Sequence, residues 1–495
     1  MLTTYRWAAL VAILTLAGCK VGPDFKHPPA PDATGYTPEP LPQQTVATNT
    51  PGGNAQQFVR DQDIPGQWWI LFHSEPLNRL IEQALRANPD LNAAQAALRE
   101  AKENVAAGEG SLFPKASLSL QAERTAINGV TSGQPKLQTT LNVVTPTLSI
   151  SYAPDVFGGT RRQIESLAAQ ADYQRFELEA TYLSLTSNVV VAAMQEASLR
   201  GQIAATQDII KLQSDQLDVV RQRFTLGGGS RADVLTQDAA LAQTKASLPP
   251  LQKQLAQTRD QLTALAGRLP SEEISETFDL ANLQLPRELP VSLPSRLVEQ
   301  RPDIRAARAQ LATASANIGV AVANQLPQFL ISPSVGTVAT GFATMFAPGS
   351  GVWALAGSVS QTVFDAGTLL HKKRAAVAAY DQAAAQYRST VIKACQNVAD
   401  TLRALQSDAD ALAAESAAER SAFASLDLSR QQYQLGAIDY LTLLNAQRTW
   451  QQARISLVQA EASRYSDTAA LFQALGGGWW HRTDIAQTND TPKQP

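Results

Sequence analysis

The segment Asn88-Pro89-Asp90-Leu91 recurs as Arg301-Pro302-Asp303-Ile304, at an offset in residue number of 302 − 89 = 213. Similar residues continue at this offset without a gap, in the pairs Leu98 and Leu311, Ala101 and Ala314, Asn104 and Asn317, Val105 and Ile318, and Pro114 and Pro327. In each copy the proline suits the first turn of a helix, and the aspartate complements the positive end of its dipole. We therefore expect a helix to begin at each copy and to run to Pro114 or Pro327.

A second block, Arg221 to Gly227, recurs as Arg430 to Gly436 at an offset of 430 − 221 = 209. Chance similarity of Ala-rich helices would not keep register and order over separate blocks, and the period is too long for a solenoid. The sequence therefore predicts a duplicated half. Each copy should contain a helix, two strands, a long helix, a turn and a returning helix.

The strand predictions rest on alternation of apolar with small polar residues, as in Ser117-Leu118-Ser119-Leu120. The same alternation marks four segments, about 115–125, 143–156, 328–340 and 352–364. One apolar and one small polar face fits the wall of a membrane barrel, and it fits equally an amphipathic hairpin on a soluble core. Periodicity alone leaves both open.

The long helices follow from a heptad seam between Leu178 and Phe224, which only Glu196, Thr206 and Gln213 interrupt. A helix from about Thr160 to Leu226 would be roughly 100 Å long at 1.5 Å per residue. Such a length indicates a rod or a tube.

Composition narrows the functional classes. The chain has 41 basic and 44 acidic residues and a net charge of −3, which argues against a nucleic-acid partner. Its two cysteines, Cys19 and Cys395, and four scattered histidines argue against a disulfide framework or a structural metal site. No catalytic motif stands out, so we expect neither an enzyme nor a cofactor. Gly227-Gly228-Gly229 lacks the following Gly-Lys-Ser/Thr of a phosphate loop, which favours a helix–helix turn.

The segment 1–18 is predicted to be a signal peptide, because Arg6 precedes a short apolar run. The run ends in Leu16-Ala17-Gly18-Cys19, which resembles a bacterial lipobox. Cys19 should then carry a covalent diacylglycerol and an N-acyl chain. Lys20 stands where an aspartate usually retains such lipoproteins in the inner membrane, so its presence indicates an outer-membrane address.

Two strands per half make 2 × 2 = 4 strands per chain, too few to close a barrel, and open sheet edges are not tolerated in lipid. Several chains must therefore contribute to one barrel, and three copies would supply about twelve strands.

Several motifs together resemble the outer membrane factor family, the TolC-like efflux ducts, and within it the NodT-type lipoproteins. They are Gly18–Phe25, Trp68-Trp69 with Phe72, Ala153–Gly158, and Leu435-Gly436 with Tyr440–Arg448. The resemblance covers essentially the whole mature chain. It implies a homotrimer with a twelve-helix α-barrel continued by a twelve-stranded transmembrane β-barrel, plus an equatorial domain. It also implies a periplasmic adaptor (membrane fusion protein) and an inner-membrane pump of the RND or a related type as partners.

The chain is accordingly expected to divide into six segments. These are the signal peptide (1–18), a lipidated linker (19–67), a first repeat (68–268), an equatorial segment (269–292), a second repeat (293–478) and a C-terminal tail (479–495).

The turns at Leu226-Gly227 and Leu435-Gly436 are the predicted helix tips, where glycine permits the positive φ of a reversal. Either these residues serve only to reverse the direction of the chain or, as the resemblance suggests, they also contact the adaptor.

The resemblance also implies a gate just past the second tip. Leu441 would form an apolar ring that can exclude water. Asn445 stands where related ducts often carry Asp, which argues against a charged ring and favours a hydrogen-bonded latch; whether hydrogen bonds or the apolar ring close the gate stays open. Arg448 lies on nearly the same helical face, and Asp439 is a lesser candidate. The alternative is that these residues only pack within the helix pair. Because the two tips differ in sequence, one hairpin should move more than the other in gating.

The leading functional hypothesis is passive export of drugs, metals or other small compounds through a tripartite efflux system. A conduit for type I protein secretion is the second. A periplasmic coiled-coil adaptor without a pore is the third, but a duplicated helix–strand–strand–helix unit does not fit an adaptor.

Overall fold

The computed structural model describes residues 20–128 and 138–482. The predicted signal peptide, Cys19 and residues 483–495 of the predicted tail lie outside the described residues. The α-helices are α2 (Glu75–Ala87), α3 (Pro89–Gly110), α4 (Gly159–Thr225), α5 (Arg231–Leu265), α6 (Pro294–Gln300), α7 (Pro302–Ala323), α8 (Thr368–Gln434) and α9 (Tyr440–Ala474). The strands are β1 (Gln57–Arg60), β2 (Lys115–Asn128), β3 (Gln138–Ser151), β4 (Glu288–Val291), β5 (Gln328–Thr337) and β6 (Gly351–Ser360).

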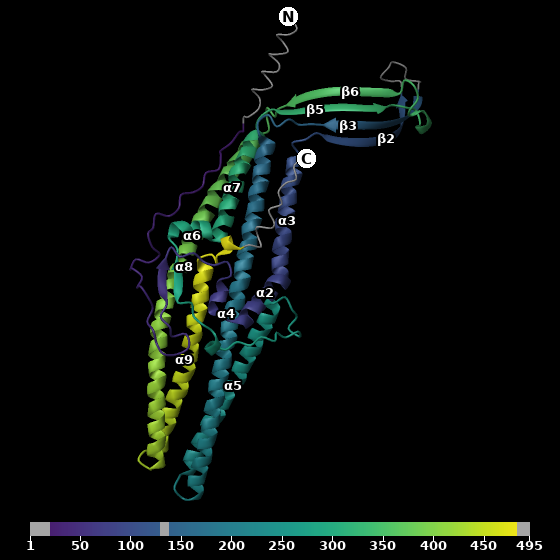
Figure 1. Ribbon diagram of the computed structural model, residues 1–495. Helices are drawn as coiled ribbons and strands as arrows, with labels where there is room; N and C mark the ends of the chain where they lie inside the picture. Colours follow the sequence, from purple (N-terminus) through teal and green to yellow (C-terminus); the bar gives the residue numbers. More distant parts are fainter. Residues whose placement is uncertain (1–19, 129–137, 483–495) are drawn as a thin grey trace. The chain divides into compact units, whose positions relative to one another are not determined.

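The order of elements in Figure 1 repeats as the sequence predicted. Helices α3 and α7 have 22 residues each, and their starting positions differ by 302 − 89 = 213. Helices α4 and α8 have 67 residues each, at an offset of 368 − 159 = 209, and α5 and α9 have 35 each, at 440 − 231 = 209. Within the described part of the chain, no helix has both the length and the apolar composition needed to cross a membrane.

Two kinds of predicted boundary need correction. Helices α3 and α7 stop at Gly110 and Ala323, before the expected prolines. The chain then turns more tightly, with hydrogen bonds three residues back from Phe113 to Gly110 and from Leu326 to Ala323. Strands β3 and β6 end at Ser151 and Ser360, short of the expected 156 and 364.

An aspartate follows each of these two strands and caps the next long helix. The carboxylate of Asp155 accepts hydrogen bonds from the backbone N–H groups of Thr160 and Arg161, at 2.9 Å each. That of Asp365 accepts one from the N–H of Leu369 at 2.7 Å. Each aspartate thereby supplies acceptors for the free N–H groups at the start of the next long helix.

Contacts divide the chain into two compact units, each with parts of both repeats. Among the described residues, one unit contains 20–28, 97–128, 138–175 and 306–388. The other contains 29–96, 176–305 and 389–482.

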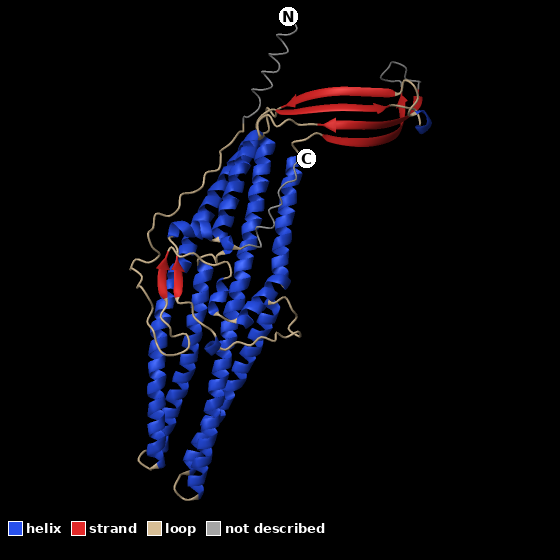
Figure 2. Ribbon diagram, in the orientation of Figure 1, coloured by secondary structure: helices blue, strands red, loops and turns tan. Residues whose placement is uncertain are grey.

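The first unit holds an antiparallel sheet in the order β2-β3-β5-β6, drawn red in Figure 2. Leu118 of β2, Leu148 of β3, Val335 of β5 and Trp353 of β6 are successive partners across all four strands. The neighbouring row is Ser117, Ser149, Ser334 and Ala354. The predicted alternation is therefore confirmed: the sheet has an apolar face on which Leu118 is 78% and Trp353 is 80% exposed.

The second unit contains two helical hairpins, α4–α5 and α8–α9, and the heptad seam is buried there at Val189, Leu199 and Val220. Two of the three polar interruptions of the seam, Glu196 and Thr206, have hydrogen-bond partners. The buried carboxylate of Glu196 accepts from Nη1 of Arg259 at 2.9 Å, and the Thr206 hydroxyl donates to a backbone carbonyl. At these two positions the buried polar side chain is satisfied by a hydrogen bond within the chain, which explains why a hydrophobic residue is not needed there.

The segments expected to form the equatorial domain pack against one another in the same unit. Strands β1 and β4 pair in parallel, which joins the linker to the inter-repeat segment. Trp68 is fully buried and stacks on Phe472, with ring centroids 5.4 Å apart. Trp479, near the C-terminal end, donates its indole N–H to the carbonyl of Gln300 at 2.6 Å.

Candidate functional site

The predicted tips are the turns that join α4 to α5 and α8 to α9. Gly227 and Gly436 have φ of 77° and 75°, a conformation that glycine adopts without a Cβ penalty. Their N–H groups donate to the carbonyls of Phe224 and Tyr433 at 3.1 Å and close the helix ends. Leu226 and Leu435 precede the two glycines and are 86% and 84% exposed. The turns thus use glycine as predicted and present a leucine to the solvent.

The returning helices begin at side-chain caps. Ser230 and Asp233 form a reciprocal capping box at α5, and the Asp439 carboxylate accepts from the N–H and hydroxyl of Thr442 at α9. The hydrogen bonds from Thr442 lower the pKa of Asp439. Asp439, a lesser gate candidate in the sequence, is in this structure the N-cap of α9.

Helix α9 separates two faces directly after this cap. The predicted gate residues Leu441, Asn445 and Arg448 are spaced by four and three residues, and all three are exposed, Leu441 by 58%. Leu443 and Leu444, in the same turn of the helix, are buried. The structure therefore brings three of the predicted gate residues onto one free surface of the helix.

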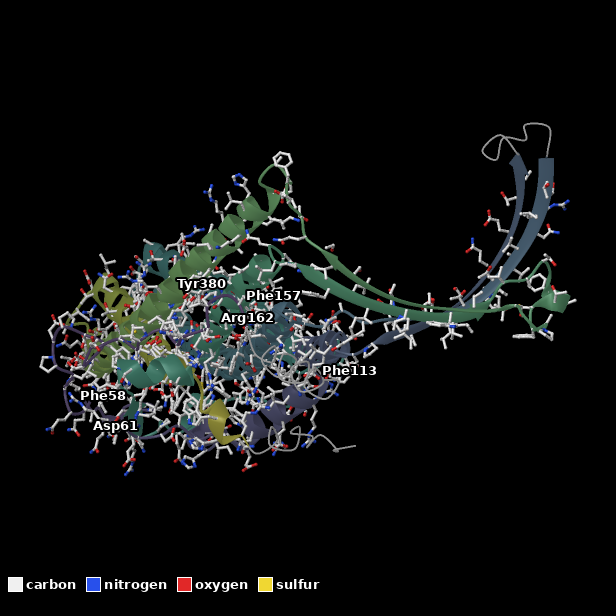
Figure 3. All side chains as sticks on the ribbon, turned by 90° about the horizontal axis from the view of Figure 1, so that it is seen from above. Phe58, Asp61, Phe113, Phe157, Arg162 and Tyr380 are labelled. Atoms are coloured by element: carbon white, nitrogen blue, oxygen red, sulfur yellow. The ribbon has the colours of Figure 1, made fainter. Side chains whose placement is uncertain are left out.

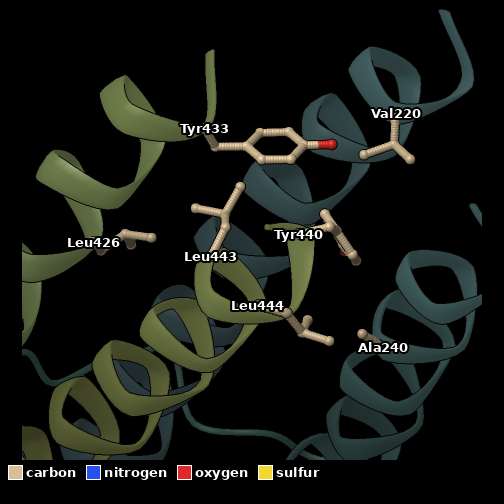
Figure 4. Close-up of a cluster of buried hydrophobic side chains, with 7 residues drawn as sticks. All are labelled: Val220, Ala240, Leu426, Tyr433, Tyr440, Leu443 and Leu444. Carbon is tan, nitrogen blue, oxygen red and sulfur yellow. The ribbon is translucent and has the colours of Figure 1, made fainter. Parts of the chain in front are cut away.

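A hydrophobic cluster packs the buried face of α9 against α8 of its own hairpin and against α4 and α5 of the other (Figure 4). It consists of Val220, Ala240, Leu426, Tyr433, Tyr440, Leu443 and Leu444. The rings of Tyr433 and Tyr440 meet edge to face at 5.8 Å between centroids, a favoured aromatic geometry. All four long helices contribute, so a separation of the hairpins would expose this cluster.

A chain of polar contacts crosses the cluster. The hydroxyl of Tyr440 donates to Oε1 of Gln237 on α5, and Nε2 of Gln237 donates to the backbone carbonyl of Gln213 on α4 at 2.8 Å. Gln213 is one of the residues that interrupt the heptad seam, but the acceptor here is its backbone carbonyl, so this bond does not depend on its side chain. Burial, with the charges nearby, raises the pKa of Tyr440, which keeps its hydroxyl protonated as a donor.

Arg223 makes a second link between the hairpins, close to the tips. Its Nη2 donates to the carbonyl of Gln434 on α8 at 2.9 Å, and its guanidinium carbon lies 4.5 Å from the centroid of the Tyr433 ring. Both contacts join the end of α4 to the end of α8. Such contacts between an arginine and an aromatic face contribute about 0.5–1 kcal/mol at exposed sites.

The sequence did not identify Tyr440, Gln237 or Arg223 as functional residues. A signal was present in the divergence of the two repeats. At the offset of the second block, Tyr440 matches Arg231, Gln237 matches Ala446 and Arg223 matches Gln432. The residues that join one hairpin to the other are thus residues at which the two copies differ.

A groove with a volume of about 410 Å³ runs beside this link, between α4 and α8. Charged residues of both signs line it, namely Asp208, Lys211, Asp215 and Arg430. Among the described residues, no three His, Cys, Asp or Glu side chains gather in a way that could hold a metal ion. This end of the two hairpins therefore offers exposed leucines and a charged groove to other helices. The two hairpins are themselves joined by a few hydrogen bonds in this region.

Comparison with known proteins identifies a family for this chain. The family model for the outer membrane efflux protein matches this chain twice, over residues 80–268 and 293–477. The pyoverdine export outer membrane protein OpmQ of Pseudomonas putida is 30% identical over 91% of this chain and 94% of its own length. The toluene efflux pump outer membrane protein TtgC of Pseudomonas putida is 27% identical over 98% of each chain. The solved outer-membrane channel OprN is 28% identical, with a TM-score of 0.83 over 93% of this chain and 100% of its own.

Proposed function

The chain belongs to the outer membrane efflux protein family, and from that premise we propose how its parts carry out export. It is an outer-membrane channel of an efflux system. Members of the family are channels and not enzymes, and they act as trimers with a periplasmic adaptor and an inner-membrane pump. We propose residues 68–268 and 293–478 as the two working repeats, separated by the equatorial segment 269–292.

One observation carries the proposed mechanism: the row Leu118, Leu148, Val335 and Trp353 makes one face of the sheet apolar, and the next row consists of three serines and an alanine. The strands at the two edges, β2 and β6, each have one neighbour among the described residues. In lipid these edges need partners. Three chains would supply 3 × 4 = 12 strands and close a barrel, with lipid on the apolar face and water on the polar one.

The four long helices of each chain would likewise form a tube of 3 × 4 = 12 helices. Native mass spectrometry of detergent-solubilised protein tests this assembly. A mass of three chains supports it, and a stable monomer would exclude it.

The gate of this tube is proposed to lie at α9. Three copies of Leu441 would narrow the pore as an apolar ring, and Asn445 and Arg448 lie on the same exposed face. The Tyr440–Gln237 and Arg223–Gln434 hydrogen bonds would hold the hairpins together in the closed state. Opening would break both links. Because the two tips differ in sequence, one hairpin would move more than the other.

The exposed tips are proposed to bind the adaptor through Leu226-Gly227 and Leu435-Gly436, and the charged groove beside Tyr433 adds polar contacts. The pump would be of the RND or a related type. The cargo is proposed to be small compounds, because relatives are named for export of pyoverdine and efflux of toluene. Co-expression with its adaptor and pump in a host that lacks its own duct should lower the accumulation of a fluorescent substrate. Export of a protein instead would place the chain in type I secretion.

The membrane anchor is proposed to include acyl chains on Cys19, as Leu16-Ala17-Gly18-Cys19 suggests. Labelled palmitate should be incorporated into the wild type and not into Cys19→Ser. The matched control is Cys395→Ser, which removes the other cysteine and should leave the labelling intact. Labelling of Cys19→Ser would exclude this site.

A further inference from the structure

Arg162, the fourth residue of α4, is fully buried, although its side chain is charged. Three of its hydrogen bonds go to a short segment near the N-terminus. Nε donates to the carbonyl of Val21 at 2.9 Å, and Nη2 donates to the carbonyl of Gly22 at 3.1 Å and to the carboxylate of Asp24 at 2.9 Å. A buried arginine with each partner in place is held firmly, whereas the same arginine without them would be costly.

Two further contacts fix the same segment. Glu165, one turn along α4, accepts from Nη1 of Arg162 at 2.8 Å and forms an ion pair with Lys20 at 2.6 Å. The backbone N–H of Val21 donates to the carbonyl of Phe157 at 3.2 Å. Phe157 lies in the connection between β3 and α4, near Arg162 (Figure 3). The segment Lys20–Asp24 is thus bound where strand and helix meet.

The fit of the segment is also steric. Gly22 has φ of 87°, and a Cβ on it would lie 2.4 Å from Cα of Gly319 on α7. A Cβ on Gly319 would lie 2.7 Å from Cγ of Arg162. Two glycines are therefore required for the backbone of the segment to reach the arginine. Arg162 belongs to the first repeat and Gly319 to the second, so the receptor is complete only when both halves have folded.

The duplication shows that this arrangement is not a requirement of the fold. The fourth residue of α8 is His371, which is exposed, at 162 + 209 = 371. The counterpart of Gly319 in α3 is Ala106, also exposed, at 319 − 213 = 106. The receptor occurs in one copy, as does the N-terminal segment that it binds.

We propose that Arg162, Glu165 and Gly319 form a receptor for Lys20–Asp24 whose function is to fix the point at which the lipid anchor leaves the protein. Cys19 directly precedes the bound segment, so the anchor is tethered within about 4 Å of Lys20. A segment released as far as Pro28 would allow a tether of roughly 30 Å. The receptor thereby holds the strand–helix junction at the membrane surface. Its purpose rests on the proposed acylation of Cys19, but its geometry does not.

Hydrogen–deuterium exchange of the acylated full-length protein tests the receptor through peptides that cover residues 20–28. Arg162→Gln removes the charge and most donors, while Gly319→Ala fills the space without changing a charge. Each should speed exchange of the Val21 amide by roughly tenfold or more, because several hydrogen bonds are lost together. The matched controls, Arg161→Gln beside the site and Gly110→Ala with nothing near its Cβ position, should leave exchange unchanged.

Unchanged protection in a folded Arg162→Gln or Gly319→Ala protein would overturn the proposal, as would rapid exchange of Val21 in the wild type. Rapid exchange of peptides from α5 would reveal that both variants fail to fold. In that case Asp24→Asn tests the receptor instead. The Asp24 side chain is 83% exposed, so the loss of its charge should loosen the segment and leave the rest of the fold intact. Unchanged exchange in Asp24→Asn would refute the receptor. Cleavage after Lys20 by a lysine-specific protease should accelerate in parallel. Conductance measured on the same samples reports on the proposed channel function separately.

Discussion

The hydroxyl of Tyr440 on α9 donates a hydrogen bond to Oε1 of Gln237 on α5, so that the second hairpin is joined to the first inside a buried cluster. Both side chains are almost completely buried. If the hairpins part, each polar group must find water, and the aromatic and aliphatic surface around them becomes exposed. The bond therefore stabilises the closed arrangement in particular.

Tyr440→Phe should favour the open channel. The change keeps the ring but leaves Oε1 of Gln237 buried without its donor, which costs about 1–3 kcal/mol in the closed state. We expect the ratio of open to closed channels in planar bilayers to rise by roughly tenfold. Tyr433→Phe is the control, because its ring lies in the same cluster while its hydroxyl does not take part in this bond. Equal behaviour of the two variants would remove Tyr440 from the latch.

Leu441→Ser should raise single-channel conductance, because a polar ring does not exclude water as a ring of leucines does. Asn445→Asp should instead increase preference for cations, since three carboxylates would face the pore. The control is Leu235→Ser, which changes a leucine of similar exposure on α5. If Leu441→Ser and Leu235→Ser conduct alike, the gate lies elsewhere.

Arginine substitutions on the two faces of the sheet should have unequal effects on membrane assembly. Leu118→Arg places a charge on the apolar face and should cost about 2–4 kcal/mol if that face meets the middle of the bilayer. Ser119→Arg, one residue along the same strand, places the charge on the polar face and should be tolerated. The fraction of heat-resistant oligomer in outer-membrane preparations measures the difference. A smaller loss for Leu118→Arg would mean that the faces are assigned the wrong way round.

Asp467 should make stability depend on pH. Burial and the neighbouring Asp408 raise the pKa of Asp467 to about 7, from an ordinary value of 3.8, with Arg464 acting in the opposite direction. The native state then binds more protons than the unfolded state between these values, so stability falls as the pH rises from about 4 to about 7. After allowance for partial exposure, the loss should be about 1–2 kcal/mol.

Asp467→Asn should remove most of this dependence and stabilise the protein at pH 8 more than at pH 4. Thermal unfolding at both values gives the answer. The exposed Asp410 provides the comparison, because Asp410→Asn should leave the dependence in place. A wild-type protein that is equally stable at pH 4 and pH 8 would contradict the raised pKa.

Much of the architecture followed from the sequence, because it depends on short-range patterns. Both offsets of the sequence repeat recur in the helices, and the tip glycines have the positive φ that a reversal requires. The alternation around Leu118 also gave the correct faces of the sheet. The ends of the strands are predicted less well: the range 143–156 includes Asp155, which caps the following helix, and the range 352–364 runs up to Asp365, which does the same.

The contacts between hairpins could not be read from periodicity. Tyr440 and Gln237 lie far apart in the sequence, and a heptad pattern reports which face of a helix is buried but not which residue it meets. Asp439 was considered for the gate, although an aspartate directly before a helix is a common N-cap. The predicted Leu441, Asn445 and Arg448 do share a free face, and their role in gating stays a prediction.

Electrical recording tests the central claim most directly. Purified protein, reconstituted from detergent into a planar lipid bilayer, should produce discrete ion-conducting steps, and the conducting species should contain three chains. Tyr440→Phe and Leu441→Ser should make those steps more frequent or larger. A protein that inserts into the bilayer as a monomer and never conducts ions, with or without these substitutions, would contradict the account of an export channel.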